Sequence, residues 1–215
     1  MGVETAGRTA DPQPLGTAYA IAALGPWPVL RFLYRMQATG LEHIPTEGGF
    51  VLAASHFSRF DPWPLGLPLY PKRKLRYMSK AELFNPIIGP PLRAVGGFPV
   101  ERGRNSSAAI DAAVELVRAG EVVAMFPEGT RRRKGLRKKI RPRAKPGAAQ
   151  IALEAGVPLV PAGISGTDHL LRFGQIRVAY GAPIPLDDLK DLDRKRAVSR
   201  ATERMMESIL RLESV

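Results

Sequence analysis

The stretch "GFVLAASHFSRFDP", residues 49–62, joins a short apolar run to a polar turn that holds a histidine and an aspartate. The run from Gly49 to Ser55 has the length and composition of a buried β-strand. His56 therefore lies at the carboxyl end of a predicted strand. Functional sites in open α/β sheets form at such ends, so this stretch predicts a site as well as a strand.

Five more apolar runs of strand length occur along the chain, at residues 74–79, 97–101, 121–127, 158–165 and 175–180. Helical periodicity fills several of the intervals and predicts helices over residues 106–119, 148–155 and 192–212. Strands that alternate with helices predict an α/β fold with a mostly parallel central sheet flanked by helices. With 215 residues, the chain suits one sizeable domain.

The N-terminal segment, residues 15–39, is the most membrane-like part of the chain. Its residues 15–36 would span about 33 Å as one straight helix, which is the thickness of a bilayer core. The sequence "GPWP" at 25–28 should break or kink that helix. We therefore expect a helical hairpin or a kinked helix in the membrane interface, with Trp27 and Tyr34 at the headgroup level. A helix that packs on the core is the alternative. Residues 1–14 are predicted to be a polar leader, and residues 40–215 the main domain.

The composition excludes several kinds of site. There is no cysteine, which excludes a disulfide framework, a thiolate metal site and a cysteine nucleophile. The three histidines are scattered along the chain, so no metal is expected. The net charge of +12 is concentrated in residues 131–145, which hold ten basic residues and no acidic one. Such a basic run predicts an anionic partner: nucleic acid, anionic lipid, a phosphorylated cofactor or an acidic carrier protein.

His56 and Asp61 are five positions apart, which on a helix would separate them by about 140°. A turn is needed to fold Asp61 back onto the imidazole, and Pro62 favours one because it disfavours helical geometry at Asp61. A carboxylate on one ring nitrogen would leave the other nitrogen to take a proton. In the alternative interpretation Asp61 simply caps a helix that begins at Pro62.

Other strand ends carry charged residues. "FPEGTR", residues 126–131, follows an apolar run and supplies the carboxylate of Glu128 and the guanidinium of Arg131. The turn at Gly129 can expose backbone amides to an anion, and arginine suits a phosphate monoester. Lys80 and Arg102 add cations at two further strand ends. Each of these stretches would by itself also fit an ordinary turn. "GVPLVPAGISG", residues 156–166, is a buried strand that offers backbone and walls.

Four sequence blocks, at residues 56–61, 98–103, 128–131 and 157–161, resemble in their order and spacing the motifs of the glycerolipid acyltransferase family. The resemblance is strongest to its 1-acylglycerol-3-phosphate acyltransferase branch. His56 and Asp61 match the family's His-x4-Asp motif. The second block is matched by "FPVERG" at 98–103, the Glu-Gly-Thr-Arg motif by residues 128–131, and the fourth block by "VPLVP" at 157–161. The resemblance covers roughly residues 40 to 185.

The resemblance implies an O-acyltransferase of phospholipid biosynthesis. Such an enzyme moves a fatty acyl group from acyl-CoA or acyl-carrier protein to the free hydroxyl of 1-acylglycerol 3-phosphate, giving phosphatidic acid. His56 would be the general base and Asp61 its orienting partner, with no acyl-enzyme and no bound cofactor. The residues implied in binding the acceptor's phosphate are Lys80, Arg102, Glu128, Gly129, Thr130 and Arg131. Another glycerolipid or a glycolipid as acceptor is the alternative.

The implied partners are a membrane lipid surface, the lysophospholipid acceptor and, as one of the two donors, acyl-carrier protein. They predict a peripheral or monotopic protein on the cytoplasmic face of the membrane. A nucleic-acid-binding protein that uses residues 131–145 is the competing class. That run contains no aromatic residue on which a base could stack. It also matches no helix-turn-helix or zinc-finger pattern, so nucleic acid is the weaker expectation.

Overall fold

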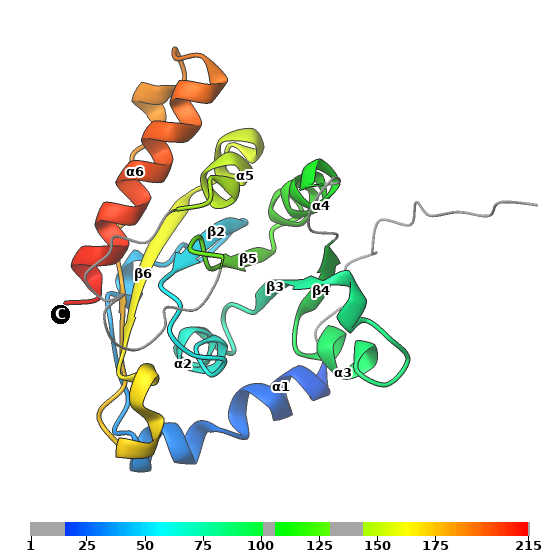
Figure 1. Ribbon diagram of the computed structural model, residues 1–215, viewed down its shortest axis with the longest axis vertical. Coiled ribbons are helices and arrows are strands. Elements are labelled where there is room, and N and C mark those ends of the chain that lie inside the picture. The colour runs from blue at the N-terminus through cyan, green and yellow to red at the C-terminus, as the bar shows by residue number, and fades with distance from the viewer. Residues whose placement is uncertain (1–15, 101–105, 130–143, 215) are drawn as a thin grey trace, which may run out of the picture.

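The computed structural model describes residues 16–100, 106–129 and 144–214 (Figure 1). Within these ranges the centre of the protein is a seven-stranded sheet with the order β1-β7-β6-β2-β5-β3-β4. Every neighbouring pair is parallel except β6 and β7, which are antiparallel. The predicted α/β fold with a mostly parallel sheet is confirmed. The strands are β1 (Gln37–Thr39), β2 (Phe50–Ala54), β3 (Leu75–Lys80), β4 (Gly97–Val100), β5 (Val122–Met125), β6 (Leu159–Ser165) and β7 (Arg177–Tyr180).

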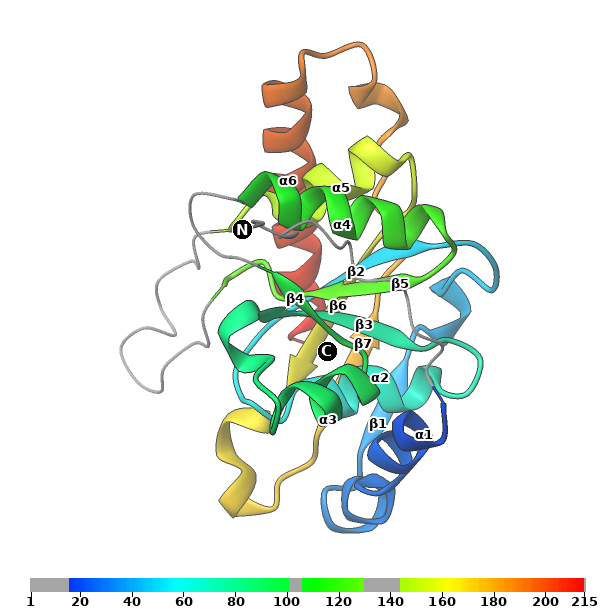
Figure 2. The ribbon, with the colours of Figure 1, turned by 90° about the vertical axis from the view of Figure 1, so that its right-hand side faces the viewer.

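Helices cover both faces of the sheet (Figure 2). The three longer ones, α4, α5 and α6, lie on one face, whereas α1, α2 and α3 lie on the other. The α-helices are α1 (Thr17–Leu24), α2 (Pro62–Gly66), α3 (Gly89–Ala94), α4 (Ser106–Arg118), α5 (Gly147–Ala155) and α6 (Arg194–Leu212). Two short helical segments matter below: the π-helical turn η1 (Val29–Leu33) and the 3-10 segment η6 (Thr167–Arg172).

The strand β2 shows why its sequence is apolar without interruption. Phe50, Leu52 and Ala54 pack in the core on the α2 side of the sheet. Val51 and Ala53 pack in the core beneath α4, α5 and α6. Because successive side chains of a strand point to opposite faces, a central strand with both faces covered must be apolar at every position.

The helix α6 lies close against β6 because of a glycine. A Cβ added at Gly163 would lie 2.3 Å from the carbonyl carbon of Leu212. No side chain fits in that space, so glycine at this position permits the contact between the helix backbone and the sheet. This contact sets the height of α6 above the sheet.

The strand β1 is a feature that the sequence analysis missed. Its residues, 37–39, fall at the end of the N-terminal segment, which the sequence analysis assigned to a helical membrane-interface region. The strand has no apolar run, and it forms because it pairs in parallel with β7 at the edge of the sheet. The backbone N–H of Gln37 donates to the carbonyl of Ile176 at 3.0 Å. The sheet therefore begins before residue 40.

The rest of the N-terminal segment is a kinked pair of helical turns, α1 and η1, separated at the "GPWP" sequence. Tyr19, Leu30 and Tyr34 are buried against the domain, so the core-packing alternative accounts for one side of the segment. The other side is exposed, as at Ile21 and Phe32, each with 69% of its surface accessible. No helix within the described ranges combines the length and the apolar character needed to cross a membrane.

Candidate active site

The turn between β2 and α2 brings His56 and Asp61 into contact. His56 Nδ1 lies 2.7 Å from Asp61 Oδ2. The same carboxylate oxygen accepts hydrogen bonds from the backbone N–H groups of Phe57 at 2.7 Å and Ser58 at 2.8 Å. The side chain of Asp61 is fully buried, whereas that of His56 is 18% exposed. The predicted contact is present, and it joins a buried carboxylate to an imidazole that solvent can reach.

The backbone of Asp61 differs from the expectation. Its φ of −53° and ψ of −33° are helical although Pro62 follows, so the prediction that proline would move Asp61 out of helical geometry is wrong. Asp61 does precede α2 in the N-cap position, with proline at the start of the helix, but its side chain makes no capping hydrogen bond. Three donors converge on the carboxylate instead. Hydrogen bonds to a charged acceptor are about twice as strong as neutral ones. Together they outweigh the steric cost of a helical backbone at the residue before a proline.

This arrangement selects one tautomer of His56. Asp61 Oδ2 accepts hydrogen bonds from the two backbone amides, and it likewise accepts from His56, so Nδ1 of the imidazole carries the proton and donates it in this hydrogen bond. The lone pair is then left on Nε2. The pair can therefore accept a proton at Nε2 while the carboxylate stabilises the imidazolium that results.

Phe126 forms one wall of the site, and the sequence analysis did not single it out. Its ring stacks on the imidazole of His56, with 4.2 Å between the ring centroids and 19° between the planes. Phe126 follows β5, which pairs directly with β2. The signal in the sequence was its position just before the Glu-Gly-Thr-Arg motif. Only the strand order places it on the histidine.

The turn at residues 126–129 carries the second group of predicted site residues. Glu128 is 7% exposed, and Gly129 has a φ of +69°, a left-handed conformation that favours glycine. The backbone N–H of Gly129 donates to the carbonyl of Phe126 at 2.9 Å. Lys145 is held at the same turn, because its backbone N–H donates to Pro127 at 2.7 Å. A Cβ at position 129 would lie 2.7 Å from the Lys145 Nζ, so glycine makes room for that side chain.

The strand order explains why distant motifs converge. β2, β5, β3 and β4 are consecutive neighbours and all parallel. Their carboxyl ends therefore lie along one edge of the sheet, which bears His56, the turn at residues 126–129 and the end of β3 at Lys80. The predicted site residues Arg102, Thr130 and Arg131 lie outside the described residues, as does the side chain of Lys80. Most of the basic run also lies outside them.

Comparison with known protein families agrees with the resemblance seen in the sequence. The family model "Acyltransferase" matches residues 35–165, which include both motifs described above. The chain belongs to this acyltransferase family.

Several similar proteins are named as acyltransferases of one kind. The acyltransferase is 33% identical over 177 residues to the 1-acyl-sn-glycerol-3-phosphate acyltransferase of Bacillus subtilis, covering 80% of this chain and 85% of that protein. It is 29% identical over 158 residues to the Streptococcus pneumoniae protein of the same name, covering 71% of this chain and 56% of that one. The crystal structure of the 1-acyl-sn-glycerophosphate acyltransferase from Thermotoga maritima has a TM-score of 0.60 at 24% identity, over 88% of this chain and 80% of that chain. The last likeness shows that the fold is shared.

Buried hydrogen bonds hold the turn between β2 and α2 in place in the acyltransferase. The Ser55 hydroxyl, which is fully buried, accepts from the backbone N–H of Ile164 at 2.9 Å and ties the end of β2 to β6. On the other side of the turn, the Tyr77 hydroxyl donates to the Pro62 carbonyl at 2.9 Å. Burial raises the pKa of the Tyr77 phenol well above its usual value. The phenol therefore remains a donor across the physiological range.

The Tyr180 hydroxyl makes the matching contact further along α2. It donates to the carbonyl of Leu65 at 2.6 Å. Burial also raises the pKa of the Tyr180 phenol. The helix α2 is thus anchored at two carbonyls by phenols that do not ionise at neutral pH.

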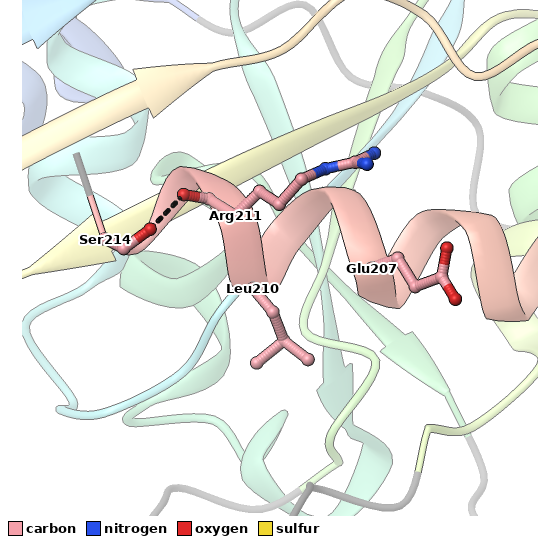
Figure 3. Close-up of a pocket in the computed structure, with 4 residues that line it drawn as sticks. All are labelled: Glu207, Leu210, Arg211 and Ser214. Atoms are coloured by element: carbon pink, nitrogen blue, oxygen red, sulfur yellow. Dashed lines mark hydrogen bonds between the residues drawn. The ribbon is translucent and has the colours of Figure 1, made fainter.

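A surface hollow of about 350 Å³ lies elsewhere, at the C-terminal end of α6 (Figure 3). Glu207, Leu210, Arg211 and Ser214 line it. These residues belong to one helix and the turn that follows it, and none of them is a predicted site residue. The hollow is therefore no candidate for the acceptor site. Within the described ranges, no group of three or more histidine, aspartate or glutamate side chains is placed to hold a metal ion.

Proposed function

We propose that this acyltransferase moves a fatty acyl group from a thioester to the free hydroxyl of 1-acylglycerol 3-phosphate, forming phosphatidic acid. The contact between His56 Nδ1 and Asp61 Oδ2 at 2.7 Å is the observation that carries the proposal. It provides the base that a hydroxyl acceptor requires. The relatives named as 1-acyl-sn-glycerol-3-phosphate acyltransferases support this choice of acceptor.

His56 acts first on the acceptor. Its Nε2 takes the proton of the hydroxyl as the oxygen attacks the thioester carbonyl, and Asp61 stabilises the imidazolium that forms. Backbone N–H groups hold the negative charge of the tetrahedral intermediate. The intermediate collapses with cleavage of the carbon–sulfur bond, and the imidazolium returns its proton to the departing thiolate. An ester and a free thiol are formed, and the enzyme regains its starting state without an acyl-enzyme.

The phosphate of the acceptor binds along the same edge of the sheet. Glu128 and Gly129 form part of this binding region, with Lys80, Arg102, Thr130 and Arg131 as its further members. Arginine presents paired donors that match two phosphate oxygens at once. The parallel order of β2, β5, β3 and β4, which gathers their carboxyl ends, supports this grouping.

The donor is acyl-CoA or acyl-carrier protein, and no cofactor is bound. Both donors carry negative charge, so the ten basic residues at 131–145 are the docking place for either. The N-terminal segment lies in the membrane interface on the cytoplasmic face, as in a peripheral or monotopic protein. Its exposed apolar side chains, at Ile21, Trp27 and Phe32 among others, support this placement.

The test is the release of free thiol from an acyl thioester, with a short-chain 1-acylglycerol 3-phosphate as acceptor. His56→Ala should lower the acceptor-dependent rate by about 10²–10⁴-fold, because the base is lost. His169→Ala is the matched control, since His169 also contacts a carboxylate, that of Asp168 at 3.2 Å, but lies outside the site. That variant should keep its activity.

Three outcomes would contradict the proposal in different ways. Equal turnover in the native protein and His56→Ala would remove His56 from the mechanism. Thiol release that does not need the acceptor would indicate a hydrolase. Turnover with another glycerolipid or a glycolipid, but not with 1-acylglycerol 3-phosphate, would correct the acceptor and leave the chemistry unchanged.

A further inference from the structure

Large apolar side chains are exposed outside the N-terminal segment as well as within it. Leu171 and Phe173, at the end of η6, are 91% and 50% exposed. Leu83, Ile87 and Ile88, just before α3, are 43%, 84% and 47% exposed. Figures 1 and 2 place α1, α3 and η6 (yellow) together at one side of the molecule, away from α4 and α5. We call the exposed side chains of these five residues, with those of the N-terminal segment, the apolar face.

Contacts join the parts of the apolar face to one another. The ring of Phe173 lies 6.0 Å from the ring of Tyr34 in the N-terminal segment. The Tyr34 hydroxyl donates to the carbonyl of Leu170 in η6 at 3.1 Å. At the other end of the segment, α1 packs against α3. Three stretches that are far apart in the sequence thus pack against one another on this side of the molecule.

Basic residues outnumber acidic ones around this surface. The N-terminal segment and residues 83–93 and 170–175 contain no acidic residue; the nearest are the exposed Glu82 beside Leu83 and the partly buried Asp168 in η6. The exposed arginines among them are Arg31, Arg35, Arg93 and Arg172. The opposite side of the molecule differs, because the stretch at 187–193 that leads into α6 holds four aspartates. An apolar surface edged by arginines complements a bilayer that contains anionic lipid.

The apolar face is connected to the turn between β2 and α2, which carries His56 and Asp61. Phe60, which lies between His56 and Asp61 in the sequence, has its ring 6.3 Å from that of Tyr34 and 5.4 Å from that of Trp63. Trp63 in α2 donates through its indole Nε1 to the carbonyl of Ala22 in α1 at 3.0 Å. The turn that carries His56 therefore packs on the inner side of the N-terminal segment.

We propose that Leu171 and Phe173, together with Ile87 and Ile88, are membrane-binding residues in their own right, and that the surface they bind is an anionic bilayer. The inference rests on the proposed lipid acceptor and extends its membrane contact beyond the N-terminal segment. Side chains as exposed as Leu171 and Ile87 protrude singly, which suits insertion among acyl chains. The N-terminal segment and η6 then enter the interface side by side, with the arginines at headgroup level.

The experiment uses the full chain and co-sedimentation with phosphatidylcholine vesicles, with and without phosphatidylglycerol. Leu171→Asp and Ile87→Asp should each weaken binding to the anionic vesicles by about tenfold or more, since a carboxylate replaces an inserted apolar side chain and repels anionic lipid. Leu171→Ser, which adds no charge, should show a smaller loss. Native binding should be weaker to vesicles of phosphatidylcholine alone.

Leu192→Asp is the matched control. Leu192 is 39% exposed and belongs to the stretch at 187–193 that leads into α6. Figure 1 draws this stretch (orange) at the end of the molecule away from α1. The substitution adds the same charge as Leu171→Asp and Ile87→Asp. Because Leu192 lies outside the apolar face, this variant should bind vesicles as the native chain does. Thermal unfolding of all variants should match the native chain, because the replaced side chains make little buried contact.

Activity separates this inference from the proposed function. Leu171→Asp and Ile87→Asp should keep the native rate on a short-chain acceptor in solution and lose rate on a long-chain acceptor presented in vesicles. Native vesicle binding by both variants would overturn the inference while leaving the acyl transfer intact. A loss of self-association in these variants, with vesicle binding unchanged, would assign the face to a second copy of the chain. Vesicle binding that falls as expected in a protein without acyl transfer would overturn the proposed function alone.

Discussion

Asp61 shows how one carboxylate serves both the turn and the site. Its Oδ2 accepts from the backbone amides of Phe57 and Ser58 and from the imidazole of His56. The amide bonds hold the turn closed, and the imidazole bond fixes the ring. The other oxygen, Oδ1, is buried without a hydrogen-bond partner among the described residues. The expected contact with His56 is therefore present, whereas the capping alternative holds only for the position of Asp61 before α2, because its side chain makes no capping hydrogen bond.

Substitutions at Phe126 test whether its ring orients the imidazole of His56. Phe126→Leu should lower kcat by about 2- to 10-fold, since an aromatic contact contributes about 0.5–1.5 kcal/mol. KM for the acceptor should stay unchanged, because Phe126 acts by orienting His56. Phe126→Tyr, which keeps the stacked ring, should retain the native kcat. Steady-state kinetics on a soluble acceptor gives both parameters.

A fall in activity that Phe126→Tyr does not rescue would contradict this positioning role. So would a rise in KM without a change in kcat, which would assign Phe126 to acceptor binding instead. Circular dichroism of each variant checks that the fold is intact. The three results lead to different conclusions about the residue.

At the scale of elements, α2 depends on its surroundings. It has five residues, two of them proline, and a helix this short is not stable by itself. The Tyr77 and Tyr180 hydroxyls bind two of its carbonyls, and the Trp63 indole ties it to α1. The helix that follows Asp61 is therefore placed by side chains from β3, β7 and its own exposed face.

The buried tyrosines predict how stability depends on pH. Burial raises the pKa of Tyr77 and Tyr180 in the folded protein above the value of 10.0 that a free phenol has. The unfolded chain then releases protons above about pH 10 that the folded protein keeps. The free energy of unfolding should be level up to that pH and should fall above it, by about 1.4 kcal/mol per pH unit for each tyrosine. Urea unfolding between pH 8 and pH 11 measures the slope.

Tyr180→Phe separates the effect of the hydrogen bond to Leu65 on stability from the effect of the titrating phenol. The variant should be less stable at neutral pH by about 1 kcal/mol, because the Leu65 carbonyl loses its hydrogen bond. It should also have a shallower fall at alkaline pH, because one titrating phenol is gone. An unchanged alkaline slope would mean that Tyr180 ionises in the folded state.

At the scale of the whole molecule, the N-terminal segment is part of the domain and not a detachable tail. Leu30 is fully buried with Tyr34, Leu67 and Ile176 in a small core of its own. The segment also ends in β1, which completes the edge of the sheet beside β7. Its exposed side forms part of the apolar face. One short stretch thus contributes to the core, to the sheet and to the proposed membrane contact.

Two leucines of η1 test this docking. Leu30→Ala should lower the free energy of unfolding by about 2–4 kcal/mol, because it removes a fully buried side chain. Leu33→Ala changes a side chain that is 47% exposed and should cost below about 1 kcal/mol. Denaturant unfolding of the full chain gives both values. Equal, small effects would mean that the segment is not packed on the domain in solution.

Most elements could be predicted from the sequence because they follow from local patterns. The strands β2 to β7 appear as apolar runs, and α4, α5 and α6 appear as helical periodicity. β1 could not be predicted in this way, since three residues without an apolar pattern form a strand only when β7 is beside them. The helical backbone of Asp61 was also missed, because the residue before proline avoids that geometry unless other contacts compensate.

By itself, the sequence determined the class of fold and the positions of the strand ends, since both depend on residues close together in the chain, and its resemblance to the acyltransferase family implied the pairing of His56 with Asp61. The tertiary structure alone decided what lies next to them. The order of the strands places Phe126 on the imidazole and brings Tyr77 and Tyr180 to α2. It also joins η6 to the N-terminal segment through Tyr34 and Phe173. These contacts link residues far apart in the sequence, and strand order is set by packing over the whole sheet, which no local pattern records.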